Sequence, residues 1–463
     1  MSKETSLVFG APIKKDGVLH NAAICISEGN LVETYFKQIL PNYKEFDEKR
    51  YFEKGNKNKI IKIKNIPIGL SICEDIWSEA FVTNLVDEGA EIILNLSASP
   101  YTTSKKETRK KMLSSYYEKY QLPIVYVNQT GGQDELVFDG SSLILGSSEK
   151  NLVELKSFEI DSLNFEYRDS KINFLNSCLT NDQNYLKDVY DALVLGTKDY
   201  VEKNNFRGVL IGSSGGIDSA LTAAIAYDAL GKGRVKTIMM PFDFTADISI
   251  EDAGLLAKNL GIEHSEISIK EMYESFSLAL KESFEGMAID KTEENLQSRC
   301  RGVTLMALSN KLGFLVLTTG NKSEAAVGYS TLYGDTAGGF SVLKDVSKTL
   351  VYELANYRNS LSVVIPKRII ERPPSAELAP DQKDTDSLPD YDRLDPIIEM
   401  YVEDDKSIQE IINEGFDEKE VRRIVSLIDF NEYKRRQAPL GIKISDRNFG
   451  KDRRYPITNS WKP

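Results

Sequence analysis

The feature that most constrains the fold is a Ser/Gly-rich loop, SGGIDS at positions 214–219. Residues 208–211 are predicted to form a strand and residues 219–230 a helix, so the loop leads from a strand into a helix. Two adjacent glycines let the backbone approach an anion closely, and the free amides of a helix start point toward it. Asp218 would repel a phosphate unless a divalent cation bridges the two groups. An ordinary capped turn is the simpler interpretation of a glycine pair, but this context favours a nucleotide-phosphate site without Walker or GxGxxG spacing.

Strands and helices alternate on both sides of this loop. Apolar runs at 235–240 and 315–318 are typical of strands that are covered on both faces. Residues 250–260 and 296–312 have the pattern of helices between such strands. The order predicts an α/β fold with a doubly wound parallel sheet.

The length of 463 residues suggests two or three domains at ~150 residues each. Short β-rich runs with one clear helix fill residues 1–165, and the polar, aperiodic stretch 166–182 is interpreted as a linker. The parallel-sheet domain then occupies residues 183–463.

Composition excludes several classes of function. Lys and Arg number 58 and Asp and Glu 70, a net charge of −12, which argues against a nucleic-acid binder. The sequence has no apolar run of ~18 residues, so it predicts no transmembrane helix. The four cysteines are scattered, which suits a reducing cytoplasm and provides no zinc-binding spacing. With two histidines, His20 and His264, the chemistry is expected to use carboxylates, lysines, a cysteine and backbone amides.

The loop resembles the pyrophosphate loop of ATP pyrophosphatases, which split ATP between its α and β phosphates to adenylate a substrate. Further motifs follow at 293–299, 317–324, 327–335, 343–349, 372–378 and 433–437. Together they resemble the synthetase domain of glutamine-dependent NAD synthetases over residues 180–463. This resemblance implies an adenine nucleotide alpha-hydrolase-like fold, ATP and Mg²⁺ as ligands, and amidation of deamido-NAD through an adenylate. Another ATP-pyrophosphatase amidotransferase, such as a GMP or asparagine synthetase, is the alternative.

The resemblance also implies roles for individual residues. Asp218 and Glu324 would bind Mg²⁺. ATP would be bound by Gly212, Ser213, Ser214, Gly215, Gly216, Ile217, Asp218, Ser219 and Thr319. Deamido-NAD would be bound by Asn295, Glu324, Tyr329, Ser330, Thr331, Leu332, Lys348 and Lys434. Residues 242–247 (FDFTAD) depart from the small polar and basic residues that the family usually has after this strand, so the contacts on the adenine side are not implied.

Cys73 ends an apolar strand-like run, and a thiol at a strand-to-helix elbow is expected to have raised thiolate character. A buried structural cysteine is the alternative. Motifs at 35–43, 95–100 and 127–134 resemble the nitrilase-like glutaminase domain of the same synthetases, an αββα sandwich with a Cys–Glu–Lys triad. The match implies Cys73 as nucleophile, Lys37 as the lysine, and Tyr43, Ser99 and Lys105 as glutamine-binding residues.

The triad's glutamate is not found at the matching position. Glu4, Glu28 and Glu33 precede Lys37, and none lies in the family's motif. We expect one or two βα units of ~30 residues to be absent from the start, through a start assigned downstream, a split gene or a true short form. A glutamine-using homo-oligomer is therefore weighed against an ammonia-dependent synthetase whose N-terminal half is a non-catalytic scaffold.

Overall fold

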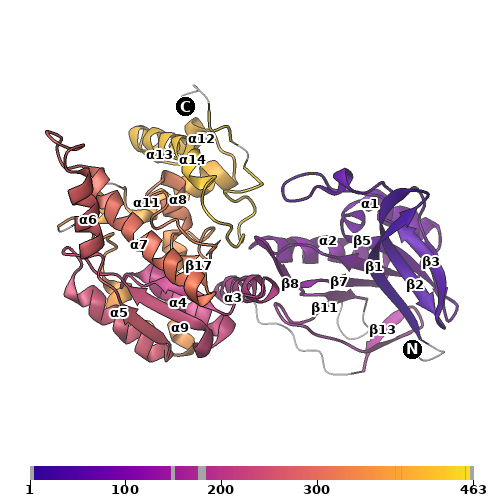
Figure 1. Ribbon diagram of the computed structural model, residues 1–463. Helices are drawn as coiled ribbons and strands as arrows, with labels where there is room; N and C mark the ends of the chain where they lie inside the picture. The colour runs from indigo at the N-terminus through magenta and orange to yellow at the C-terminus, as the bar shows by residue number, and fades with distance from the viewer. Residues whose placement is uncertain are drawn as a thin grey trace. The chain divides into compact units, whose positions relative to one another are not determined.

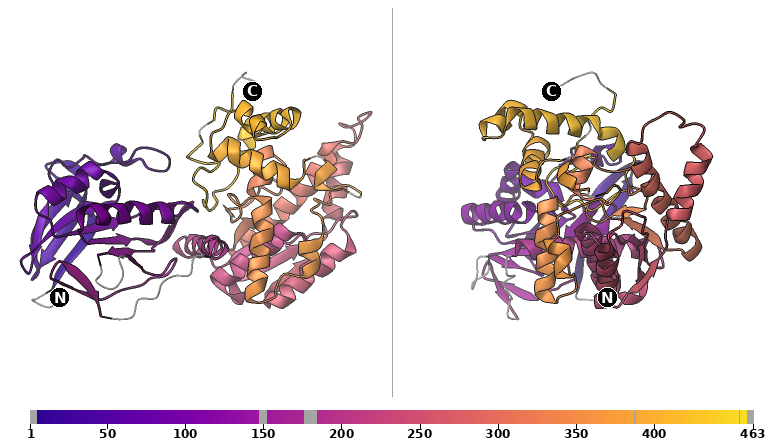
Figure 2. Two further views of the ribbon diagram at one scale, coloured as in Figure 1. Left: turned by 180° about the vertical axis from the view of Figure 1, so that it is seen from behind. Right: turned by 90° about the vertical axis from the view of Figure 1, so that its left-hand side faces the viewer.

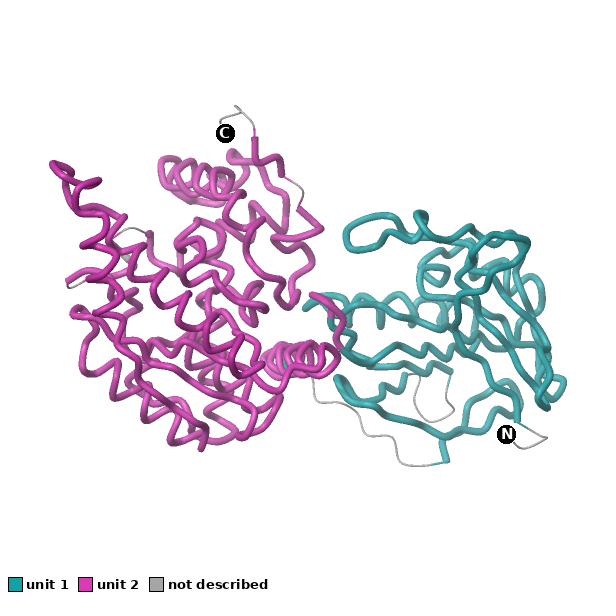
Figure 3. Tube along the Cα trace, in the orientation of Figure 1, with its two compact units in different colours: residues 1–131, 137–184 teal, residues 132–136, 185–463 magenta. Residues whose placement is uncertain are grey.

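The computed structural model describes residues 5–146, 152–175, 184–380, 382–386, 388–453 and 455–458. The chain divides into two compact units (Figure 3). The first contains Met1–Gly131 and Val137–Asn184, and the second contains Gly132–Leu136 and Tyr185–Pro463.

The two larger sheets of the first unit have three and six strands, and several of these strands are labelled in Figure 1. Strands β1 (Ser6–Lys15), β2 (Val18–Ser27) and β3 (Asn30–Phe36) form an antiparallel sheet. A six-stranded sheet has the order β11-β10-β7-β6-β5-β4, in which β5, β6 and β7 are parallel. Its bounds are β4 Ile60–Ile63, β5 Ile66–Ile72, β6 Ile92–Ser97, β7 Ile124–Asn128, β10 Leu143–Leu145 and β11 Leu152–Glu154. Helices α1 (Glu79–Asp87) and α2 (Lys105–Tyr120) accompany it.

One hairpin differs from the expectation of an aperiodic linker. Strands β12 (Phe165–Arg168) and β13 (Lys171–Phe174) pair antiparallel within the first unit. Asp169 and Ser170, the two residues between them, both have positive φ, at 55° and 59°. A two-residue loop of this kind matches the twist of paired strands, and an Asp-Ser pair is a weaker signal for it than Asn-Gly. The rest of the expected linker, residues 176–182, lies outside the described residues.

The second unit is built on a five-stranded parallel sheet with the order β16-β15-β14-β17-β18. Its strands are β14 Val209–Gly212, β15 Val235–Met239, β16 Glu263–Glu266, β17 Leu315–Thr318 and β18 Phe340–Ser341. The strand order reverses between β14 and β17, and ligands of such sheets bind at the carboxyl ends of the strands at this point. The α/β fold class expected from the sequence is confirmed.

Helices cover both faces of this sheet (Figure 2). Right-handed crossovers place α4 and α5 on one face and α6 and α7 on the other, and each of these pairs packs together. Helix α4 is rich in alanine and almost wholly buried, so that it lies close beneath the strands. The bounds are α3 Tyr185–Lys203, α4 Ile217–Leu230, α5 Asp247–Leu260, α6 Lys270–Leu280, α7 Lys291–Leu312, α9 Lys348–Leu361 and α10 Lys367–Glu371.

A helical cluster with its own apolar core completes the second unit. Buried aliphatic residues of α11 and α13 pack there against α8, which begins just after the carboxyl end of β17. The bounds are α8 Lys322–Val327, α11 Tyr391–Ile398, α12 Ile408–Asn413, α13 Glu418–Phe430 and α14 Glu432–Arg435. Among the described helices, none combines the length and apolar character needed to cross a membrane.

Candidate active sites

The SGGIDS loop follows β14 and lines a cavity of about 320 Å³. Gly215 has φ +78°, a conformation that disfavours any residue with a side chain. The Ser214 hydroxyl accepts a hydrogen bond from the Gly216 amide at 3.2 Å, and the Ser219 hydroxyl donates to the Gly216 carbonyl at 3.0 Å. These bonds hold the loop open, with its amides at the start of α4 and at the cavity wall.

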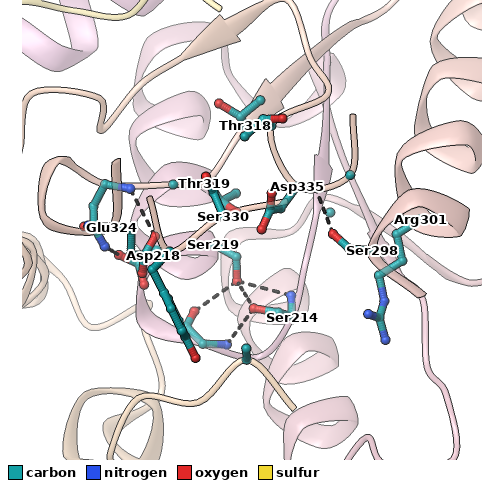
Figure 4. Close-up of a pocket in the computed structure, with 18 of the residues that line it drawn as sticks. Ser214, Asp218, Ser219, Ser298, Arg301, Thr318, Thr319, Glu324, Ser330 and Asp335 are labelled. Atoms are coloured by element: carbon teal, nitrogen blue, oxygen red, sulfur yellow. Dashed lines mark hydrogen bonds between the residues drawn. The ribbon is translucent and has the colours of Figure 1, made fainter. Parts of the chain in front are cut away.

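Three charged side chains meet at one end of the cavity, Asp218, Glu324 and Lys348. Figure 4 labels the two acidic residues. The Lys348 ammonium lies 2.5 Å from Asp218 Oδ2 and 3.2 Å from Glu324 Oε1. Asn321 donates to the other oxygen of Asp218 at 2.8 Å. Burial and the neighbouring Asp218 carboxylate raise the pKa of Glu324 despite Lys348, and the two carboxylates raise the pKa of Lys348. Two carboxylates this close can share a hard divalent cation.

Most of the implied nucleotide-binding residues line this one cavity. They are Gly212, Ser213, Ser214, Gly215, Gly216, Ile217, Asp218, Ser219, Thr319, Glu324, Tyr329, Ser330, Lys348 and Lys434. The Lys434 ammonium donates to the carbonyls of Gly328 and Ser330 at 2.7 and 2.8 Å, which fixes the segment that follows α8.

Three implied deamido-NAD residues are not among those that line the cavity: Asn295, Thr331 and Leu332. The Thr331 hydroxyl donates to the Asn295 side chain at 2.7 Å, so these two form a supporting contact behind Ser330. The Leu332 carbonyl accepts a hydrogen bond from Arg299. Their direct contact with a substrate stays a prediction.

Sequence reasoning missed several residues of the cavity. Asp384 accepts a hydrogen bond from Tyr391 at 2.9 Å, and the Tyr391 ring lies 5.4 Å from the Lys348 ammonium. Asp335 accepts the Thr331 amide at 2.8 Å, and loss of solvation raises the pKa of its carboxyl to about 6. Asp384 comes from a polar stretch without a recognisable pattern, so only the fold brings it to the cavity.

The unusual 242–247 loop packs on itself and on α6. The Phe242 ring packs against the Tyr273 ring of α6 in a tilted arrangement, with centroids 4.8 Å apart and an interplanar angle of 59°. Glu377 holds the end of the loop, because its carboxylate accepts the Ala246 amide and the Ser249 hydroxyl. Arg372 in turn donates to Ser249 and Glu377, so the loop after β15 is tied to the segment after α10.

In the first unit, Cys73 follows β5 with φ 44° and begins a 3₁₀ turn, Cys73–Trp77. The strained elbow fits a nucleophile, but the expectation of raised thiolate character is wrong. Burial raises the pKa of the Cys73 thiol, and the nearby Lys37 ammonium opposes this shift without cancelling it. Glu74 and Glu48 raise the pKa further, because a negative charge disfavours a thiolate.

A buried carboxylate joins Lys37 to the Cys73 elbow. Asp75 accepts the amides of Gln38 and Ile39 through one oxygen, and the Ile72 amide and the Tyr35 hydroxyl through the other. This residue ties the end of β3 to the end of β5. Nothing in the local sequence distinguishes it from an exposed acidic residue.

The Lys37 ammonium is almost fully buried and contacts both carboxylate oxygens of Glu48 at 2.8 Å. Glu48 was not predicted, because it follows Lys37 in the sequence, whereas the family's glutamate precedes the lysine. Glu33 lies on β3 and pairs with Lys59, Glu28 lies in a turn, and Glu4 lies outside the described residues.

The implied glutamine-binding residues differ in their surroundings. The Tyr43 hydroxyl donates to Glu74 at 2.7 Å, beside Cys73. Ser99 is buried, and its backbone pairs with the Asn128 side chain. The Lys105 ammonium lies 4.1 Å from the centre of the Trp77 ring, and burial lowers its pKa. These contacts support the elbow, and binding of glutamine by them stays a prediction.

Comparison with known families defines the class of protein. Residues 189–438 match the family model of NAD synthase, and residues 2–162 match the carbon-nitrogen hydrolase model. The chain is thus a carbon–nitrogen ligase with an NAD synthase domain and a domain of the carbon-nitrogen hydrolase family.

The particular family follows from full-length relatives. The glutamine-dependent NAD(+) synthetase of Acinetobacter baylyi is 47% identical over 100% of this chain and 86% of the relative. That of Thermotoga maritima is 45% identical over 97% of this chain and 84% of the relative. The structure of the Acinetobacter baumannii synthetase in complex with ADP has a TM-score of 0.78 at 44% identity, over 99% of this chain and 85% of that one. The chain belongs to the glutamine-dependent NAD(+) synthetases. This confirms the resemblance found in the sequence and excludes the alternative of a GMP or asparagine synthetase.

Proposed function

We propose that this protein amidates deamido-NAD to NAD at the cavity beside the SGGIDS loop, with consumption of ATP. The carboxylate of deamido-NAD attacks the α-phosphorus of ATP, and pyrophosphate leaves. Ammonia then attacks the activated acyl carbon, and AMP leaves as the second product. The single observation that carries the proposal is the convergence of the phosphate loop with Asp218, Glu324 and Lys348 in one cavity.

The chain's own groups have separate tasks in this scheme. Amides at the start of α4 and the hydroxyls of Ser214 and Ser219 bind the triphosphate. Lys348 neutralises charge that develops on the phosphates as pyrophosphate departs. Tyr391 and Asp384 hold the lysine and its neighbours in place.

Asp218 and Glu324 are the residues that would hold Mg²⁺. Within the described part of the chain, no group of three or more His, Cys, Asp or Glu is placed to bind a metal alone. Mg²⁺ commonly uses one or two protein carboxylates and takes its other ligands from water and substrate phosphates, so the pair fits. When bound, the ion would neutralise the phosphates that Asp218 otherwise repels.

We further propose that glutamine supplies ammonia at Cys73. The thiol would attack the side-chain amide carbon of glutamine, and Lys37 would stabilise the oxyanion. The C–N bond would then break, so that ammonia leaves with the thiol proton and a thioester remains. Water would hydrolyse the thioester to glutamate and the free thiol. The high pKa of Cys73 favours slow glutamine use by the polypeptide 1–463, so an ammonia-dependent synthetase with a non-catalytic N-terminal half is the second candidate. The four scattered cysteines support a location in the reducing cytoplasm. We also propose that the protein is a homo-oligomer.

The test measures NAD formation and its stoichiometry from deamido-NAD, ATP and either ammonium or glutamine. AMP and pyrophosphate in equal amounts to NAD are expected, and ADP with phosphate would refute the adenylate route. Asp218→Asn keeps the oxygen that accepts from Asn321 but loses a charge, so the fold should persist while activity is lost. Full activity in that variant would refute the cation site.

The same assay separates the two nitrogen donors. We expect ammonium to drive NAD formation faster than glutamine, and Cys73→Ala to remove only the glutamine-driven rate. Equal rates with both donors would show that a proton acceptor for Cys73 works at full efficiency. An unchanged glutamine rate in Cys73→Ala would refute the glutaminase role of this unit.

A further inference from the structure

The cavity has a second end, chemically unlike the carboxylate end. In Figure 4 Arg301 lies on the opposite side of Ser214 and Ser219 from Asp218 and Glu324. Apolar side chains line this region: a Cβ on Gly212 would meet Leu305 at 3.2 Å and the Met240 methyl at 3.4 Å. Leu305 and Arg301 are one helical turn apart, so they share a face of α7.

Arg301 is oriented by one backbone contact. Its Nε donates to the Met240 carbonyl at 3.0 Å, at the carboxyl end of β15. Within the residues that the structure describes, its two terminal nitrogens have no protein acceptor. Loss of solvation lowers the pKa of Arg301 to about 10, so the guanidinium stays protonated at neutral pH.

The two other arginines that line the cavity are already engaged. Arg372 donates to Glu377 and Ser249, and Arg435 pairs with Glu432 and backbone carbonyls. Among the described arginines of the cavity, Arg301 alone has neither terminal nitrogen in a hydrogen bond to the protein, so both can donate to a ligand. The 242–247 loop, from which a basic residue could otherwise reach this end, contains none.

The part of a bound ATP molecule that Arg301 contacts depends on how the nucleotide lies in the cavity. The phosphates of ATP belong at the SGGIDS loop, and their charge belongs near Lys348 and the carboxylate pair. The base then extends to the end that is lined by Met240 and Leu305, because a flat purine gains from apolar walls, whereas charged groups of Asp218, Glu324 and Lys348 meet at the other end.

We propose that Arg301 is the residue that recognises the purine of ATP, with its guanidinium donating to a ring nitrogen while the Met240 carbonyl accepts from the exocyclic amine. This inference rests on the proposed ATP site and specifies its base. A donor next to an acceptor matches adenine, whose amine donates beside an accepting ring nitrogen. Hypoxanthine places a carbonyl where the amine would be, and two acceptors would then face each other.

The test compares ligands that share the phosphates and differ in the base, by calorimetry on the full chain. ADP, IDP and inorganic pyrophosphate are the probes. Arg301→Met retains most of the apolar stem and removes every donor, and Arg422→Met, an exposed arginine paired with Glu418 on α13, is the matched control. Loss of a charged hydrogen bond corresponds to ~10- to 100-fold, so ADP should bind that much more weakly to Arg301→Met.

Pyrophosphate should bind Arg301→Met and the unchanged protein equally, and the unchanged protein should prefer ADP over IDP. An unchanged ADP affinity, or an equal loss for ADP and pyrophosphate, would overturn the inference, since the latter places Arg301 on the phosphates. If Arg301→Met fails to fold, Arg301→Lys decides, because lysine keeps the charge but lacks the rigid planar fork of donors that can hold the Met240 carbonyl and a base nitrogen side by side. Wild-type ADP affinity in Arg301→Lys would refute the role.

These binding measurements do not depend on the reaction. If the protein forms no NAD but Arg301→Met weakens binding of ADP and not of pyrophosphate, the proposed function is refuted. The role of Arg301 in recognising the purine then still holds. In the ammonium-driven assay Arg301→Met should raise KM for ATP and leave KM for deamido-NAD unchanged. A rise in the deamido-NAD KM alone would count against the assignment.

Discussion

Gly215→Ala is the sharpest perturbation of the phosphate loop. Gly215 has φ +78°, and a Cβ at this position would lie 2.8 Å from the Ser249 Cα and closer still to the Ser249 carbonyl oxygen. Both contacts are to backbone, which cannot rotate away as a flexible side chain can. The alanine would therefore be strained in two independent ways.

The magnitude follows from these two costs. A non-glycine residue in a left-handed or otherwise sparse conformation costs about 1–3 kcal/mol. Overpacking against a fixed neighbour costs about 1–3 kcal/mol more. We expect a loss of ~2–6 kcal/mol in the free energy of unfolding, or a displaced loop that binds ATP poorly.

Gly216→Ala is the matched control in the same loop. Gly216 has φ −93°, and its Cβ would meet only the Ser214 hydroxyl, at 3.2 Å. Urea unfolding of both variants and the KM for ATP in the ammonium-driven assay give the comparison. Wild-type stability together with wild-type ATP affinity in Gly215→Ala would refute the reasoning.

Three further predictions concern other buried groups. Asp75→Asn keeps one oxygen acceptor but points a side-chain N–H at a backbone N–H, so the free energy of unfolding in urea should fall by about 1–3 kcal/mol. The variant should slow NAD formation with glutamine but not with ammonium. An equally slowed ammonium-driven rate would refute a role confined to the Cys73 turn. Because the pKa of the Cys73 thiol is raised, its alkylation by iodoacetamide should keep rising above pH 8.5, and Lys37→Met should slow it at every pH; a plateau near pH 7 would contradict this. Because the pKa of Asp335 is raised, this residue stabilises the fold at low pH, and the contribution is lost as the pH rises through about 6. The free energy of unfolding of the wild type, compared with that of Asp335→Asn, should therefore fall between pH 4 and pH 7. A rise in this difference would refute the pKa shift.

The parallel sheet was predictable because its strands are covered on both faces. β14 and β17 are unbroken apolar runs, and the sequence marks them clearly. Helix α1 and hairpin β12–β13 were missed, since both are short and the Asp169–Ser170 turn lacks glycine. Periodicity identifies elements that bury a continuous face, and it has little information on short elements whose burial depends on distant partners.

The candidate sites divide in the same way. The phosphate loop was predictable because its donors are adjacent in the chain. Glu48, Asp75 and Asp384 were not, because each acquires its role from a partner that only folding brings near. Arg301 belongs to a helix that the sequence predicts, but its direction toward the cavity depends on how α7 crosses the sheet.

The Asp75 carboxylate has a consequence for protein engineering. Its two oxygens fasten the segment after β3, which contains Lys37, to the turn after β5, which contains Cys73, although β3 and β5 belong to different sheets. A designer who transplants the proposed nucleophile Cys73 and its lysine Lys37 onto another scaffold would lose the carboxylate that holds their two segments together. A transplant of these two groups therefore has to carry Asp75 as well.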